Sequence, residues 1–303
     1  MDDKHVNNAS LPPSLLKKKG QAMRYITLRE EDRQLLLHLH SFIYLHRSFI
    51  EKYIFHTYEN IDSVYRRLRT LEEAGYVKAF MLPINDFDHR PSKVYTLTMF
   101  GAEIVEQMRG VVHWNRRWTT QVPPWYQHQL MIAELVKSYE LKASEHGLEV
   151  KEWITEARAF YEFRNLNEGK KNGKNVIRPD GIIVIGKPGS DQNMGIMLEM
   201  ERSYATREKT LRKMEQFNEF FSRREELLPK YDKKIGFEYP VKGWKILFIG
   251  GNEAKTLKIL RDLKGEEENA EVPVMVANRQ EANMDPFGEI YRYLTRPNEK
   301  KKL

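Results

Sequence analysis

One segment, residues 60–74, constrains the fold of the first third of the chain most strongly. Its apolar residues recur every three or four positions, the spacing that puts them on one face of an α-helix. They are Ile61, Val64, Tyr65, Leu68 and Leu71. Asn60 is suited to cap the start of this helix, and Gly75 to end it just past the last turn. We therefore predict a helix that packs one face onto a core.

The segments around this helix predict a small unit of helices and strands. A capping box at residues 27–30 predicts a first helix, and a second is expected over residues 46–55. Two strand-like runs follow the third helix, at residues 76–82 and 93–97, and a further helix is expected over residues 98–110. Three helices followed by a β-hairpin are typical of a winged helix-turn-helix.

The face of the third helix opposite the apolar stripe carries cations and hydroxyl groups. Its residues are Ser63, Arg66, Arg67, Arg69 and Thr70. Arginine donates two hydrogen bonds as a fork to phosphates and to guanine edges, so this face is a candidate for duplex DNA binding. Arg90 and Lys93, at the tip of the expected hairpin, are placed to reach the neighbouring groove or backbone. The alternatives are an ordinary solvated face and a winged domain that binds protein.

Composition agrees with a polyanionic partner and excludes several classes of protein. The 303 residues include 50 Lys and Arg against 43 Asp and Glu, a net charge of +7. No apolar run reaches the ~18 residues of a membrane span, and residues 1–22 lack the apolar core of a secretory signal. Cysteine is absent, which excludes disulfides, thiolate catalysis and cysteine-ligated zinc. A reducing cytoplasm is the expected location.

Changes in pattern along the chain predict five parts. We expect a flexible basic arm (1–22), a winged helix-turn-helix domain (23–110), a linker (111–124), an α/β domain (125–297) and a charged tail (298–303).

The α/β domain is expected to be a sandwich because strand-like and helical segments alternate through it. A long helix is expected over residues 125–143. Strands are expected at residues 148–154, 158–164, 176–185, 194–200, 244–250 and 272–277, and helices at residues 205–227, 252–264 and 286–294.

Carboxylates are expected to converge at one end of this sandwich. Asp180 precedes an apolar strand, and Glu199 and Glu201 share one face of the next strand, since residues i and i+2 point the same way. Converging carboxylates repel one another unless a cation or proton intervenes. Mg²⁺ suits such a site and can activate water for phosphodiester cleavage, with Glu162, or failing that Glu156, as a further ligand. The alternative is that the acidic residues only pair with nearby Arg and Lys residues.

Short motifs in both halves resemble the replication-relaxation proteins of plasmids and integrated elements in Gram-positive bacteria. The resemblance covers roughly residues 24–250. The motifs are Tyr25-Ile26-Thr27, Asp32-Arg33, Leu36, Tyr65-Arg66-Arg67-Leu68-Arg69, Leu71, His128-Gln129-Leu130-Met131-Ile132-Ala133-Glu134, Arg178-Pro179-Asp180 and Leu198-Glu199-Met200-Glu201-Arg202. The resemblance implies a winged helix joined to a domain similar to the PD-(D/E)XK nuclease fold, and a role in plasmid replication or its control.

The resemblance also assigns candidate catalytic residues. Pro179-Asp180 matches the PD element and Glu199 the second acidic position, whereas Glu201 stands where the usual lysine would be. Lys213, or Lys209, could offer the missing positive charge from the next helix. Many relatives of this fold that lack the lysine do not cut. The resemblance therefore leaves open an active Mg²⁺-dependent endonuclease or nickase, with Mg²⁺ held by Asp180, Glu199 and Glu162, and a degenerate domain without a cofactor.

The sequence thus predicts a DNA-binding protein of a plasmid or mobile element that acts in replication initiation or its regulation. The expected partners are double-stranded DNA and other replication proteins, with a homodimer left open and no membrane association. A protein-binding scaffold or a transcriptional regulator remains the alternative.

Overall fold

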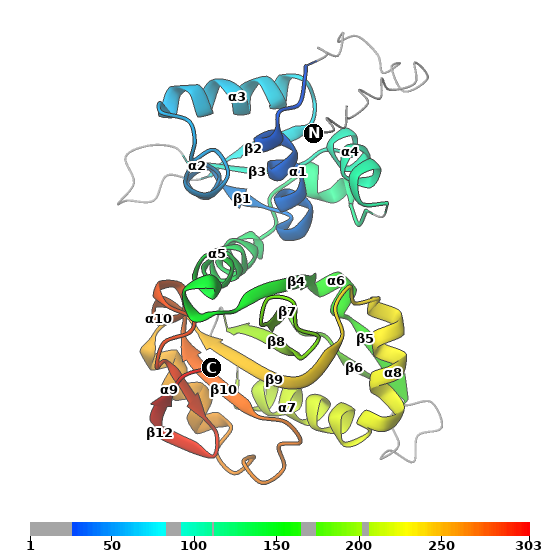
Figure 1. The fold of residues 1–303 in the computed structure, drawn as a ribbon, viewed down its shortest axis with the longest axis vertical. Coiled ribbons are helices and arrows are strands. Elements are labelled where there is room, and N and C mark those ends of the chain that lie inside the picture. Colours follow the sequence, from blue (N-terminus) through cyan, green and yellow to red (C-terminus); the bar gives the residue numbers. More distant parts are fainter. Residues whose placement is uncertain (1–25, 83–91, 111, 165–173, 202–205) are drawn as a thin grey trace. The chain divides into compact units, whose positions relative to one another are not determined.

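The computed structural model describes residues 26–82, 92–110, 112–164, 174–201 and 206–303 (Figure 1). The chain divides into two compact units, which are described separately. Unit 1 comprises Met1–His40 and His46–Gln121, and unit 2 comprises Ser41–Leu45 and Val122–Leu303. Within the described ranges, no helix has the length and apolar character needed to cross a bilayer.

Unit 1 contains three helices followed by a β-hairpin and a fourth helix. In chain order its elements are α1 (Glu30–Phe42), β1 (Leu45–His46), α2 (Arg47–Tyr53), α3 (Ile61–Glu73), β2 (Val77–Met81), β3 (Lys93–Leu97) and α4 (Met99–Arg109). The three strands form one sheet in the order β1-β3-β2, with β2 and β3 antiparallel. The expected element order is therefore present, whereas the arm over residues 1–22 and the hairpin tip lie outside the described residues.

The bounds of α3 follow from its capping residues, as the sequence predicts. The Asn60 side chain accepts a hydrogen bond from the Asp62 N–H at 2.8 Å, and Gly75 has the left-handed φ of 81° that favours glycine after a helix. Val64, Leu68 and Leu71 are buried. Ile61 does not join this stripe: it is 52% exposed, because the first residue of the helix lies past the edge of the packed core.

The start of α1 differs from the predicted capping box. The helix begins at Glu30, so Thr27 does not cap it, and the Asp32 carboxylate instead accepts a hydrogen bond from the Arg29 N–H at 2.7 Å. Glu30, Glu31 and Asp32 all lie in the first turn, where negative charge is stabilised by the helix dipole. Acidic residues within the helix thus set its start.

Two local signals set the bounds of α4. The Thr98 hydroxyl accepts a hydrogen bond from the Gly101 N–H at 3.1 Å, and Gly110 follows the helix with a φ of 79°. In the segment beyond it, the Trp114 indole N–H donates to the Leu97 carbonyl at 3.0 Å, which anchors this connection to β3.

Unit 2 is built on a mixed seven-stranded sheet in the order β12-β11-β10-β9-β8-β7-β4. Strands β4, β7 and β8 are antiparallel neighbours, β8, β9 and β10 run parallel, and β11 and β12 return antiparallel. The strands are β4 (Glu149–Thr155), β7 (Gly181–Gly186), β8 (Asn193–Glu201), β9 (Val241–Gly250), β10 (Val274–Asn278), β11 (Tyr291–Tyr293) and β12 (Arg296–Lys301). This confirms the expected α/β class.

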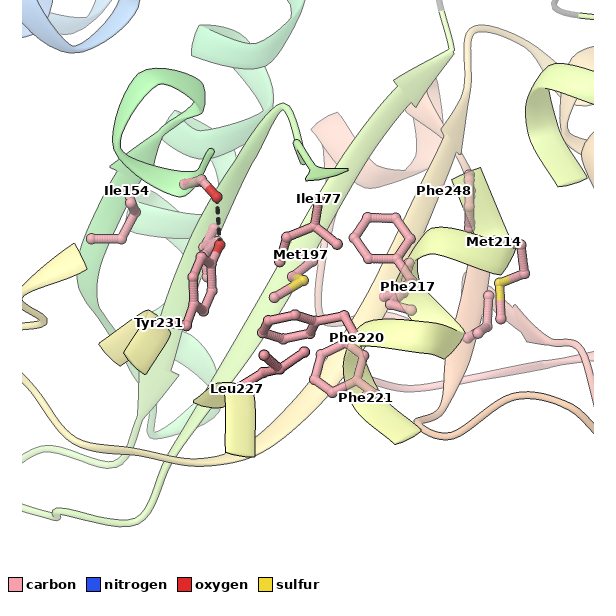
Figure 2. Packing of buried hydrophobic residues seen from close by; sticks show 14 of the residues in the cluster. Ile154, Ile177, Met197, Met214, Phe217, Phe220, Phe221, Leu227, Tyr231 and Phe248 are labelled. Atoms are coloured by element: carbon pink, nitrogen blue, oxygen red, sulfur yellow. Dashed lines mark hydrogen bonds between the residues drawn. The ribbon is translucent and has the colours of Figure 1, made fainter. Parts of the chain in front are cut away.

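Helices cover both faces of this sheet (Figure 1). Helices α7 (Arg207–Ser222), α8 (Arg224–Ile235) and α9 (Glu253–Asp262) lie over one face, and α5 (Tyr126–Lys142) and α10 (Arg279–Met284) lie over the other. Figure 2 shows the first interface, where Phe217, Phe220 and Phe221 of α7 pack beside Met197 of β8. The Tyr231 hydroxyl of α8 donates to the Ala159 carbonyl at 2.6 Å, so this buried phenol is satisfied.

Two expected strands are interrupted. The run expected over residues 158–164 begins as the short helix α6 (Glu156–Ala159) and becomes β5 (Tyr161–Arg164). The run over residues 176–185 is two strands, because Pro179 has no N–H to pair and separates β6 (Lys174–Ile177) from β7. Strands β5 and β6 pair with each other in a separate two-stranded sheet.

The predictions near the C-terminus and for the long helix are wrong in part. The helix expected over residues 205–227 is two helices, α7 and α8, and residues 286–294 contain β11 instead of a helix. The expected charged tail is mostly strand β12, whose side chains are largely exposed. Backbone pairing to β11 holds this strand, so hydropathy gives no sign of it, and lysines are common on such edges.

Candidate functional sites

The exposed face of α3 carries two arginines available to a partner. Arg66 is exposed, and among the described residues its guanidinium reaches only the Ser63 hydroxyl, at 3.1 Å, and the Asp62 carbonyl on its own helix. The Arg69 side chain is 80% exposed and pairs with Glu73 one turn later, at 2.8 Å between Nε and Oε1. Both guanidinium groups lie opposite the buried stripe, so solvent can reach them.

Arg67, grouped with them from the sequence, has a different environment. Its side chain is only 12% exposed and makes a two-pronged ion pair with Asp32 of α1, which is fully buried. Arg67 Nε donates to Asp32 Oδ1 at 2.9 Å, Nη2 donates to Oδ2, and Nη2 also reaches the Thr27 carbonyl at 2.9 Å. The hydrogen bond to Asp32 raises the pKa of Arg67 further. We therefore correct its expected role from DNA contact to a residue that holds α3 against α1.

The remaining candidates of unit 1 are less exposed or lie elsewhere. Ser63 and Thr70 are half-buried, and the Thr70 hydroxyl donates to the Arg66 carbonyl at 2.8 Å. Lys93 begins β3, in register with Met81 of β2. Arg90 lies outside the described residues. The candidate DNA-binding face of α3 therefore consists of Arg66 and Arg69, fewer residues than the sequence predicts.

In unit 2, the pairing of β7 with β8 brings Asp180 beside Glu199. The Asp180 N–H donates to the Leu198 carbonyl at 2.9 Å, and Asp180 Oδ2 accepts from the Met200 N–H at 2.7 Å. The next residue must be small: a Cβ on Gly181 would lie 2.0 Å from the Trp153 ring. These backbone contacts fix the Asp180 carboxylate against β8 on both sides of Glu199.

Asp180 is held as a charged group by its surroundings. Its Oδ1 lies 3.0 Å from Nε2 of His128, which α5 supplies. Burial alone would raise the pKa of Asp180, but the hydrogen bond from His128, the charge of Lys213 and the Met200 N–H outweigh it and lower that pKa. Asp180 therefore stays ionised at neutral pH.

Glu199 is more deeply buried, with 4% of the residue exposed. Its Oε2 forms an ion pair with the Lys213 ammonium of α7, and its Oε1 is buried without a hydrogen-bond partner among the described residues. Burial raises the pKa of Glu199 to about 8, against the opposing effect of Lys213. Burial alone would lower the pKa of Lys213, but the attraction of Glu199 and Asp180 outweighs it and raises that pKa.

Glu199 borders a cavity of about 500 Å³ in unit 2. Glu199 and Glu201 both line it, which agrees with their expected common face on β8. Three cations of α7 line it as well, at the helical spacing that puts them on one face: Lys209, Arg212 and Lys213. The other lining residues are Trp125, His128, Met200, Thr210, Gln216, Phe248 and Ile259.

The expected metal site of Asp180, Glu199 and Glu162 is not assembled. Glu162 is an exposed residue of β5, in the separate two-stranded sheet. Within the described part of the chain, no group of three or more His, Asp or Glu side chains is placed to hold a metal ion. Both Asp180 oxygens have partners and Glu199 Oε2 has Lys213, so the donor set does not fit Mg²⁺, which requires near-octahedral oxygen ligands.

The structure adds residues that the sequence does not assign to the site. The sequence places His128 in the helix expected over residues 125–143 without a role at the site, yet it contacts Asp180. Arg178, next to the PD element, pairs with Glu156 at 2.6 Å, so this part of the acidic motif does form an internal ion pair. The one advance signal for His128 is that it opens the stretch of the family resemblance over residues 128–134; its contact with Asp180 has no local signature.

Comparison with known proteins agrees with the resemblance. The family model for replication-relaxation matches residues 36–231, more than half of the chain. No curated protein matches it. Among solved structures it is similar to the restriction endonuclease FokI, at 13% identity and a TM-score of 0.28. That match covers 84% of this chain and 42% of the FokI chain, so it spans less than half the length of that protein. The match to the family model shows that the chain belongs to the replication-relaxation family.

Proposed function

We propose that this protein binds duplex DNA through α3 and acts in replication initiation, or its regulation, on a plasmid or mobile element. The observation that carries the proposal is the exposure of Arg66 and Arg69 on a helix whose opposite face, with Leu68 at its centre, is fully buried. An α-helix fits the major groove, where arginine donates to guanine edges and to flanking phosphates.

The contacts that these arginines already make are weak enough to be exchanged. The Arg69–Glu73 pair is an exposed pair one turn apart on a helix, and such pairs contribute about 0.3–0.5 kcal/mol. A phosphate oxygen can replace Glu73 at little cost. Within the part of unit 1 that the structure describes, Arg66 donates only to groups of its own helix, so it can turn outward without leaving a buried group there unpaired.

In this proposal unit 1 is a winged helix-turn-helix, with α3 as the recognition helix and the β2–β3 hairpin as the wing. Arg67 acts as a positioning residue: by pairing with Asp32 it sets the orientation in which α3 presents Arg66 and Arg69. Membership of the replication-relaxation family supports the setting in replication. The net charge of +7 supports a polyanionic partner.

Fluorescence anisotropy with labelled duplex DNA tests the proposal. We expect Arg66→Glu/Arg69→Glu to abolish measurable binding while circular dichroism stays unchanged. Replacement of both arginines by alanine is a milder change. It should lower the slope of the logarithm of the DNA-binding constant against the logarithm of the salt concentration by about 1.8, or about 0.9 for each lost phosphate contact. The control is Arg207→Glu/Arg261→Glu, which changes the net charge equally at exposed positions of unit 2. Equal loss in both double variants, or no loss in the first, contradicts the proposal.

The second candidate is Mg²⁺-dependent DNA cleavage by the cluster around Asp180. The neighbouring β7 and β8 carboxylates favour it, and their pairing with His128 and Lys213 opposes it. Incubation of supercoiled plasmid with Mg²⁺ or Mn²⁺ separates the outcomes. Nicking by the wild type that Asp180→Ala abolishes would establish it, whereas no nicking, or nicking that survives the substitution, would reject it. A purely protein-binding scaffold predicts no salt-sensitive DNA binding in the anisotropy experiment.

A further inference from the structure

We propose that Lys213 is the counter-ion of Glu199 in place of a divalent cation, so that the acidic cluster of unit 2 is metal-independent and gains a cation site only when the Lys213 ammonium is removed. The proposal does not rest on DNA binding by α3. Its basis is the pairing of each carboxylate in the cluster with a basic side chain from a helix of unit 2.

The first step is charge balance. The Asp180 carboxylate, 14% exposed, lies just before β7 and beside the buried Glu199 of β8, and carboxylates so far removed from water are stable only when protonated or paired. Lys213 pairs with Glu199, and the His128 ring contacts Asp180. The Met200 N–H adds a hydrogen bond to Asp180. The chain therefore supplies the compensation that a cation would otherwise provide.

The second step concerns the charges around the pair. Lys209 and Arg212 line the same cavity from the same helix face as Lys213, against the two lining carboxylates of Glu199 and Glu201. Of these three cations, Lys213 forms the ion pair with Glu199 and so occupies the place next to that carboxylate.

The ion pair with Lys213 engages one of the two Glu199 oxygens, Oε2. Glu199 Oε1 is buried beside the cavity without a hydrogen-bond partner among the described residues. With Lys213 neutral, both Glu199 oxygens become available next to Asp180, in a cavity of about 500 Å³ that has room for a cation with several of its waters. Removal of one charge therefore converts a closed ion pair into an oxygen-rich cation site.

Mn²⁺ binding to the full-length protein tests this, by electron paramagnetic resonance of the free ion at about pH 8, where protons compete less for Glu199. Lys213→Met keeps most of the apolar stem and removes the charge. We expect it to bind Mn²⁺ at least about tenfold more tightly than the wild type. The matched control, Lys209→Met, removes one charge from the same cavity wall without freeing Glu199, and should resemble the wild type. Adding Asp180→Asn to Lys213→Met should abolish the gain.

Two results would overturn the proposal: wild-type protein that binds Mn²⁺ as tightly as Lys213→Met, or a folded Lys213→Met that gains no affinity. Lys213→Gln provides a second test if the methionine variant does not fold, because it removes the charge but can still donate a hydrogen bond to Glu199. None of these outcomes depends on Arg66 and Arg69. Loss of DNA binding in their double variant and the Mn²⁺ result are therefore separately interpretable.

Discussion

The α3 face of unit 1 and the acidic cluster of unit 2 both carry charged motifs, but their environments differ. On α3, Arg66 and Arg69 point to solvent and make only exposed contacts. In the cluster, Asp180 and Glu199 are paired with side chains of the same unit. The comparison teaches that a charged motif is available to an outside partner only where no buried internal partner neutralises it. Arg67 shows the same contrast within α3. It follows Arg66 directly, yet its ion pair with the buried Asp32 keeps it from an outside partner.

The largest effect is expected from breaking the buried pair of α3. Arg67→Met leaves the Asp32 carboxylate buried and unpaired, so we expect the free energy of unfolding to fall by about 3–5 kcal/mol in urea denaturation. Glu73→Gln, which breaks the exposed pair with Arg69, should change it by no more than about 0.5 kcal/mol. Adding Asp32→Asn to Arg67→Met should restore part of the loss. Similar losses of unfolding free energy in Arg67→Met and Glu73→Gln would contradict a structural role of Arg67 that Arg69 does not share.

A smaller effect is expected from disturbing the backbone that positions Asp180. Gly181→Ala would put its Cβ 2.0 Å from the Trp153 ring, so the ring or the strand must shift. Overpacking of this kind costs about 1–3 kcal/mol of unfolding free energy. Gly243→Ala in β9 is the matched control, because its Cβ would meet no atom within 4 Å. Equal stability of the two variants in thermal denaturation would show that the close approach at Gly181 does not constrain the cluster.

A third expected effect is a pH dependence from Glu199. Burial raises its pKa to about 8 from an ordinary value of 4.5, so between these values the folded protein binds more protons than the unfolded chain. The contribution of Glu199 to stability is therefore most favourable below about pH 4.5 and declines as the pH rises towards 8. We expect Glu199→Gln to gain stability relative to the wild type as urea titrations move from pH 5 to pH 8. A constant or opposite difference would contradict the raised pKa.

Elements with local end signals are those that the sequence predicts best. Asn60 and Gly75 bound α3, and Thr98 and Gly110 bound α4, because capping groups act within a few residues of the helix end. The failures lie where pairing with a distant segment decides the structure. Strand β12 is exposed and charged and exists through its hydrogen bonds to β11, which leave no pattern in its own residues.

In the candidate sites too, features set within one strand are predicted well, and features set by the pairing of distant segments are not. The alternation of a β-strand places Glu199 and Glu201 on one face, and both do line one cavity. The proposed convergence with Glu162 is wrong, because Pro179 separates β6 from β7 and Glu162 belongs to the sheet of β5 and β6. Spacing along the chain predicts neighbours within a strand or helix, whereas it does not predict which sheet a strand joins.

The sequence by itself determined the order of helices and strands in unit 1, the α/β class of unit 2 and the side chains that carry the charge, because these depend on apolar spacing and on short-range capping. Only the tertiary structure decided which of those charges are free. The pairs Arg67–Asp32, His128–Asp180 and Lys213–Glu199 join different elements of the fold. The physical reason is desolvation: a charge that folding removes from water must find a partner, and the three-dimensional arrangement alone supplies it.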